Sequence, residues 1–237
     1  MPAPFPNKPA YLTIDDGPSP LMAERVEFLA ARNLPAIWFC RGDFLEVRPE
    51  PALAALRHGA IIGNHTYDHT YCSKLTPTRF AEQIDHTERI IERLHARAGV
   101  PRRAKYFRFP FEERIGPPEH FAALQQILRE RGFTRPAFAD VPYRFFHHAD
   151  HANDLSLFWT YDTRDWSLPA QNDPRADTVL AEVLARMDEH DPENSLGLNE
   201  PGAAEVIVMH DHGHTAYLWE QIVERLLAKG LRFTLPA

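Results

Sequence analysis

Short apolar runs alternate with longer amphipathic stretches along the whole chain. Runs of strand length that are rich in Val, Ile, Phe and Tyr and bounded by turn-forming residues predict β-strands. The predicted strands are "YLTID" (11–15), "AIWFC" (36–40), "AIIGN" (60–64), "AKYFRF" (104–109), "FTRPAFA" (133–139), "SLFWTYD" (156–162), "EVIVMH" (205–210) and "LRFTL" (231–235).

Five amphipathic stretches predict helices, and most of them begin at a Pro that supports a helix start. Four start at Ser19-Pro20, Thr76-Pro77, Pro117-Pro118 and Asp173-Pro174, and the last carries Leu218, Ile222, Val223 and Leu226. Strands that alternate with helices of this length indicate βα units and a mostly parallel sheet.

The number of these units favours an α/β barrel of the (β/α) type over an open sheet. A chain of 237 residues, 44% of them hydrophobic, suits one domain spanning residues 1–237. Two polar segments, 140–155 and 188–204, look like loop insertions and are long enough to shape a substrate cleft.

Composition excludes several classes of function. A net charge of −7 and a pI near 6.0 give no electrostatic case for binding nucleic acid. No apolar run approaches the roughly 18 residues that span a bilayer. The first ten residues, "MPAPFPNKPA", lack the apolar core of a signal peptide. We therefore expect a cytoplasmic protein, or a secreted or periplasmic one if a leader has been removed.

Polar residues follow the apolar runs, at the strand ends where barrels of this type carry their catalytic residues. Asp15 and Asp16 end the first predicted strand in "TIDDGP". An acidic residue at such a place often only caps the turn. Two adjacent carboxylates repel each other, however, unless a positive group lies beside them.

The third predicted strand leads into "NHTYDHT", in which His65 and His69 are four residues apart. On a helical turn this spacing places both imidazoles on one face, although exposed loop histidines often show the same pattern. Two histidines and one carboxylate are a common ligand set for Zn²⁺. We therefore expect one divalent metal ion, with zinc favoured and Co²⁺, Ni²⁺ or Fe²⁺ able to occupy the same ligands.

Three further strand ends carry charged side chains. Arg108 precedes a Phe-Pro-Phe turn, and an arginine beside a carboxylate would lower the pKa of that acid. Asp162, Asp165 and Trp166 follow the sixth strand. His210 follows four apolar residues in "VIVMHDHGH" and is the best candidate for a general acid, while His212 and His214 are interpreted as loop histidines.

Five stretches taken together resemble the polysaccharide deacetylase family, the NodB-homology domain of carbohydrate esterase family 4. That family carries T-F-D-D-G-P, H-[ST]-x-x-H, R-x-P-[YF], D-x-x-D-W and L-x-H in this order. The matching stretches here are "TIDDGP" (13–18), "HTYDH" (65–69), "RFPF" (108–111), "DTRDW" (162–166) and "VMH" (208–210). The resemblance implies a distorted (β/α)7 barrel of the NodB type, which agrees with the barrel inferred from the strand pattern.

The resemblance also implies a role for each matching residue. It assigns the catalytic base to Asp15, the metal triad to Asp16, His65 and His69, the tuning of the base to Arg108, the acid to His210 and the partner of that acid to Asp165. Phe111 falls where the family usually has tyrosine, whose backbone N–H helps to hold the oxyanion. Trp166 and Met209 match apolar wall positions around the acetyl methyl group.

The sequence therefore predicts a metal-dependent hydrolase that removes N- or O-acetyl groups from a carbohydrate, with a glycan containing N-acetylglucosamine favoured. Metal-activated water would attack, Asp15 would act as base and His210 as acid. An amidase or deformylase of the same superfamily with a small non-polymeric substrate is the alternative. A catalytically inactive barrel that binds glycan or metal is less favoured, because both the base and the acid are present.

Overall fold

The computed structural model describes residues 7–112, 117–136, 138, 140–147, 154–170 and 172–236. Its strands and α-helices, in chain order, are β1 (Lys8–Gly17), α1 (Met22–Ala31), β2 (Ala36–Cys40), α2 (Gly42–Val47), α3 (Pro49–Arg57), β3 (Ile61–Asn64), α4 (Pro77–Ala98), α5 (Pro118–Glu130), β4 (Tyr161–Asp162), α7 (Ala176–Arg186), β5 (Glu205–His210), α8 (Ala216–Ala228) and β6 (Leu231–Phe233). Short 3-10 turns lie at Cys72–Lys74, Pro110–Glu112, Asp165–Ser167, Pro192–Asn194 and Gly213–Thr215.

The strands form one parallel sheet with β1 at its centre. Its order is β3-β2-β1-β5-β4, and β6 pairs with the first residues of β1. In this register Asp15 of β1 lies opposite Phe39 of β2 and His210 of β5. The carboxyl ends of three neighbouring strands therefore meet at one end of the sheet.

The sheet continues past β3 and curves round on itself. Asn64 at the end of β3 bridges to Phe107, and Phe107 bridges to Ser156. The segment that begins at Ser156 reaches β4, which pairs with β5 on the opposite edge of the sheet. Residues 156–162 thus connect both edges, and the wall is a distorted barrel in which single bridges replace a continuous ladder on one side.

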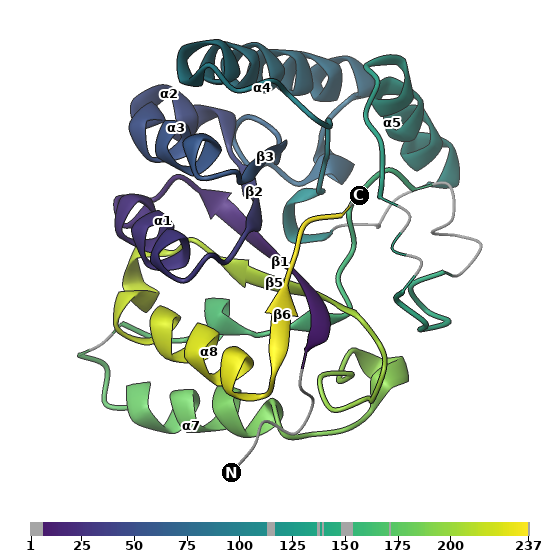
Figure 1. The fold of residues 1–237 in the computed structure, drawn as a ribbon. Coiled ribbons are helices and arrows are strands. Elements are labelled where there is room, and N and C mark those ends of the chain that lie inside the picture. The colour runs from purple at the N-terminus through teal and green to yellow at the C-terminus, as the bar shows by residue number, and fades with distance from the viewer. Residues whose placement is uncertain are drawn as a thin grey trace.

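Helices lie around the outside of the strands (Figure 1). Alternation along β1 separates two cores: Leu12 and Ile14 pack with residues of the surrounding helices, whereas Tyr11 packs with Phe39 and Val206. No helix in the described part of the chain has the length and apolar character needed to cross a bilayer.

Most predicted elements are present. The predictions for 36–40 and 205–210 match β2 and β5 to the residue. The strand predicted at 104–109 is reduced to the bridge at Phe107, and the one predicted at 156–162 to the bridge at Ser156 and the short β4. The strand predicted at 133–139 is absent from its described residues, where Pro136 interrupts the apolar run. Helices α2 and α3 have no counterpart in the sequence prediction.

Residues of both predicted insertions contact the ends of the barrel where strands begin. Lys8, the first residue of β1, donates to the carbonyls of Gly197 and Leu198 at 2.7 and 3.1 Å. Tyr143 donates to Glu205, the first residue of β5. No described residue of either insertion lines the cavity at the strand ends, and a role of these loops in shaping a substrate cleft stays a prediction.

Helix α4 shows how local sequence sets an element, and it generates a stability prediction. Thr76 accepts a hydrogen bond from the Arg79 N–H at 3.2 Å, and Gly99 ends the helix with a φ of 69°. Replacing Thr76 with Ala removes the only side-chain acceptor at this N-cap, so we expect the free energy of unfolding to fall by about 1 kcal/mol. Urea denaturation of Thr76→Ala measures the loss. Thr76→Ser keeps the acceptor, and a loss of the same size in that variant would contradict the capping explanation.

Candidate active site

A β-bulge at the end of β1 explains how two consecutive carboxylates reach one cavity. Asp15 pairs with Phe39 and Gly17 with Cys40, which leaves Asp16 as an extra residue in the ladder. Asp16 takes a φ of 65°, a conformation that Asp tolerates better than most residues. Neighbouring strand residues normally point to opposite faces, and the bulge removes that alternation here.

Asp15 is held by an arginine buried inside the barrel. Nη1 of Arg108 donates to Oδ1 of Asp15 at 2.7 Å and to Oγ1 of Thr13 at 2.8 Å, while its Nε donates to the carbonyl of Leu157 at 2.7 Å. Arg108 has no exposed surface, and Asp15 is 4% exposed. The second carboxylate oxygen of Asp15 therefore remains directed at the strand tips, where Nε2 of His65 lies 3.9 Å away.

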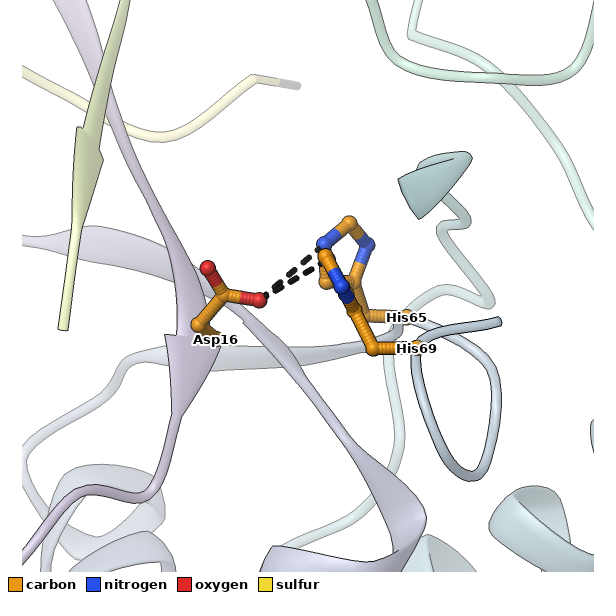
Figure 2. A group of neighbouring side chains, drawn as sticks. All are labelled: Asp16, His65 and His69. Atoms are coloured by element: carbon orange, nitrogen blue, oxygen red, sulfur yellow. Dashed lines mark ion pairs between the residues drawn. The ribbon is translucent and has the colours of Figure 1, made fainter. Parts of the chain in front are cut away.

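Asp16, His65 and His69 form a compact cluster of metal-ligand type (Figure 2). Oδ1 of Asp16 lies 3.0 Å from Nε2 of His69 and 3.6 Å from Nε2 of His65. The three ligand atoms all lie within 4.8 Å of one another. Oδ1 of Asp16 is buried yet accepts no hydrogen bond of good geometry, which is the condition expected of an oxygen that serves a cation.

The tautomer of His65 suits the same purpose. Its Nδ1 lies 2.8 Å from the carbonyl oxygen of Arg108, which can only accept, so Nδ1 carries the proton and Nε2 presents its lone pair to the carboxylates. Burial lowers the pKa of His65 to about 4, against the opposing charges of Asp15 and Asp16. A neutral imidazole nitrogen facing two carboxylate groups is favourable when a cation lies between them, so these residues fit a divalent metal ion.

His210 and Asp165 form a second hydrogen-bonded pair at the strand ends. Nδ1 of His210 lies 2.9 Å from Oδ1 of Asp165, and the backbone N–H of His210 donates to Oδ2 at 2.8 Å. Thr163 also donates to Asp165, which is completely buried. Burial alone would lower the pKa of His210, but the charge and hydrogen bond of Asp165 outweigh it and raise that pKa to about 9. The ring is therefore cationic at neutral pH and can donate a proton.

His212 contacts the metal-site carboxylate, which the sequence analysis missed. Its Nε2 lies 2.8 Å from Oδ2 of Asp16, on the carboxylate oxygen that does not face the other two imidazoles. Burial alone would raise the pKa of Asp16, but the imidazoles of His212, His69 and His65 hold it well below the usual range. The signal was the alternation of His210 and His212, which places both on the same side of the chain after β5.

These groups share one cavity of about 780 Å³. Its lining includes Asp15, Asp16, His65, His69, His210, His212, Phe111, Trp159 and Trp166. Phe111 is 53% exposed, stacks on Tyr71 with ring centroids 4.0 Å apart and lies edge-on to His69. Trp166 is 49% exposed and donates its indole N–H to Asp162 at 3.2 Å. Both aromatic side chains are thus available to a ligand.

The prediction that Met209 forms a cavity wall is wrong. Met209 has no exposed surface, packs in the core between the sheet and the helices, and does not line the cavity. It precedes His210 on β5, and strand alternation directs it to the other face.

Comparisons with known proteins identify the family of this chain. A family model described as polysaccharide deacetylase matches residues 3–135. The chain is 27% identical over 241 residues to a peptidoglycan-N-acetylglucosamine deacetylase from Bacillus cereus, covering 99% of this chain and 69% of the relative. It is 28% identical over 203 residues to a chitooligosaccharide deacetylase from Rhizobium leguminosarum bv. phaseoli, covering 85% and 67%.

A solved structure shows the same fold. The family 4 carbohydrate esterase from Streptomyces lividans, in complex with acetate, superposes with a TM-score of 0.65 at 23% identity, covering 97% of this chain and 93% of that one. The chain belongs to the polysaccharide deacetylase family, as the five motifs predicted.

The contact of His212 with Asp16 generates a prediction about metal affinity. Replacing His212 with Ala removes the group that orients the Asp16 carboxylate, and losses of this kind typically weaken metal binding about 10- to 100-fold. Competition with a chromophoric chelator measures the zinc dissociation constant of the apo-protein. His58→Ala, which removes an exposed imidazole outside this cavity, is the control. Equal zinc affinity in His212→Ala and wild type would show that His212 does not contribute to metal binding.

Proposed function

We propose that this protein is a metal-dependent deacetylase that hydrolyses N-acetyl groups on a glycan containing N-acetylglucosamine. The observation that carries the proposal is the convergence of three sets of side chains at one cavity: the Asp15 carboxylate held by Arg108, the cluster of Asp16, His65 and His69, and the His210 imidazole held by Asp165. The names of two relatives, a peptidoglycan-N-acetylglucosamine deacetylase and a chitooligosaccharide deacetylase, support the same substrate class.

Asp16, His65 and His69 would hold the metal ion, and zinc is the ion that two imidazoles and one carboxylate suit best. When bound, the ion supplies Lewis-acid chemistry that makes water more acidic and the acetyl carbonyl more electrophilic. Asp15 accepts the proton of the attacking water, and the hydrogen bond from Arg108 fixes the orientation of that carboxylate.

The remaining proton transfer falls to His210. An amine leaves poorly as an anion, so the nitrogen must be protonated as the tetrahedral intermediate breaks down. His210 donates that proton, and Asp165 keeps the imidazole charged and fixes its orientation through Nδ1. The backbone N–H of Phe111 would hold the oxyanion. Phe111 and Glu112 both have positive φ values, 57° and 48°, which marks a turn held in an unusual conformation beside the cavity.

The test of this function is acetate release from chitooligosaccharides by the zinc-loaded protein. Turnover of these substrates supports the proposal. Release of acyl groups only from small cyclic amides or formylated sugars would point to the amidase or deformylase alternative. Zinc binding without release of any acyl group would identify an inactive barrel.

Two substitutions separate the base from the metal ligands. Asp15→Asn keeps the shape of the side chain but cannot accept a proton, so we expect kcat to fall at least about 100-fold while zinc remains bound. His65→Ala removes a ligand, and we expect zinc and activity to be lost together. Acetate assays paired with metal analysis of the purified variants measure both quantities.

Asp173→Asn is the matched control for these variants. Asp173 pairs with Arg175 on the surface and lies outside the cavity, so we expect wild-type activity and zinc content. An Asp15→Asn enzyme with near-wild-type rates would falsify the base assignment.

The pKa of His210 sets the alkaline limit of activity. Because that pKa is raised to about 9, His210 is protonated below this pH and loses its proton as the pH rises through it. In Asp165→Asn the stabilising charge is gone while burial still favours the neutral ring, so the pKa falls toward or below its ordinary value of 6.5. We expect the alkaline limb of the kcat/KM profile to move to lower pH by at least one unit. If the alkaline limb of the Asp165→Asn profile stays at the wild-type pH, the ion pair with Asp165 does not set the pKa of the catalytic acid.

A further inference from the structure

One wall of the active-site cavity is basic, and the chemistry proposed above does not use it. Arg41, Phe44 and Arg48, which belong to α2 and its two flanking residues, all line the cavity. Cζ of Arg41 lies 3.9 Å from the centre of the Phe44 ring, and Cζ of Arg48 lies 5.2 Å from it. Stacking on an aromatic ring positions a guanidinium group without neutralising its charge.

The backbone joins this basic wall directly to the metal-ligand segments. The Arg41 N–H donates to the carbonyl of Gly17, one residue beyond Asp16, at 2.9 Å. The Gly42 N–H donates to the carbonyl of Thr66, one residue beyond His65, at 3.0 Å. A Cβ on Gly42 would meet the Tyr67 side chain at 2.5 Å, so α2 packs closely against the loop that carries His65 and His69. The wall is therefore a rigid neighbour of the reacting centre.

Only one of the two arginines in this wall is neutralised. Arg41 donates from Nε and Nη2 to the two oxygens of Asp43, at 3.1 and 2.6 Å. Arg48 makes no ion pair with any described residue, and its Nε is buried without a hydrogen-bond partner. Leaving a buried donor unpaired costs free energy, which a ligand that accepts its hydrogen bond would recover.

The carboxylates that line the cavity form no ion pair with Arg48 in the described part of the chain. Asp15 is paired with Arg108, and Asp211 with Arg25. Asp162 accepts from the backbone N–H of Arg164 and the indole of Trp166, on a different segment of the lining. A guanidinium without an ion-pair partner among the described residues can bind a negatively charged group, and its planar N–H groups fit the two oxygens of a carboxylate.

We propose that Arg48 forms an anion subsite that binds a carboxylate on the acylated substrate, beside the sugar whose acetyl group is removed. This inference rests on the deacetylase function proposed above and narrows the substrate class from glycans containing N-acetylglucosamine to those that also carry a carboxylate. Phe44 would pack against the apolar atoms next to that carboxylate, because it lines the same wall.

A pair of ligands that differ only in charge tests the subsite. The probes are a disaccharide of N-acetylglucosamine and N-acetylmuramic acid, with its lactyl carboxylate free, and the same disaccharide with that carboxylate converted to a methylamide. Calorimetry with the zinc-loaded protein measures binding of each probe, and acetate assays measure kcat/KM for each.

We expect wild type to bind the carboxylate form about 10- to 100-fold more tightly than the amide, the range of a hydrogen-bonded charged group. Arg48→Gln should remove this preference, and Arg48→Lys, which keeps the charge without the fork, should retain part of it. Arg57→Gln, an exposed arginine of α3 outside the cavity, is the matched control and should keep the full preference.

The two proposals fail in different ways. If the carboxylate probe binds with the Arg48-dependent preference but no acetate is released, the subsite stands and the deacetylase function is wrong for this glycan. If wild type binds both probes equally, or if Arg48→Gln keeps the wild-type preference, the subsite is overturned whatever the turnover. Failure of wild type to bind the carboxylate probe at millimolar concentration also overturns it.

Discussion

The ion pair between Arg108 and Asp15 is the interaction on which the rest of the site depends. It lies inside the barrel, where Arg108 is completely buried and spans from Leu157 on one side to Thr13 and Asp15 on β1. The same residue accepts from His65 through its backbone carbonyl. One residue therefore orients the proposed base and sets the tautomer of a proposed metal ligand. Removing one partner of such a buried pair typically destabilises a protein by roughly 3–5 kcal/mol, so this geometry is costly to alter.

The two ends of the barrel differ in the residues that they carry. At the ends where strands finish, a bulge brings Asp15 and Asp16 to one cavity and the register places His210 beside Asp15. At the ends where strands begin, the salt bridge of Lys8 and Glu205 is buried and binds the described parts of both long loops. The candidate active site and the contacts that hold the loops thus lie at opposite ends of the strands.

The motifs were predictable because strand ends and ligand spacing leave direct traces in the sequence. Asp16, His65 and His69 lie together as the pattern predicted, while the error at Met209 came from placing an apolar motif residue without applying strand alternation. The predicted strand at 133–139 failed because apolar composition alone does not supply a partner strand. The role of His212 and the basic wall at Arg48 depend on contacts between segments far apart in the chain, which a single sequence does not record.

Two histidines in the one cavity illustrate how partners decide chemistry. His65 and His210 are both largely removed from solvent, and both place Nδ1 within hydrogen-bonding distance of an oxygen, at 2.8 and 2.9 Å. The partner of His65 is a neutral carbonyl, so burial dominates and its pKa falls to about 4. The partner of His210 is a buried carboxylate, so its pKa rises to about 9 despite the same burial. A neutral imidazole can ligate a metal and a cationic one can protonate a leaving group, so the oxygen that contacts Nδ1 of each ring decides which of the two proposed roles that ring suits.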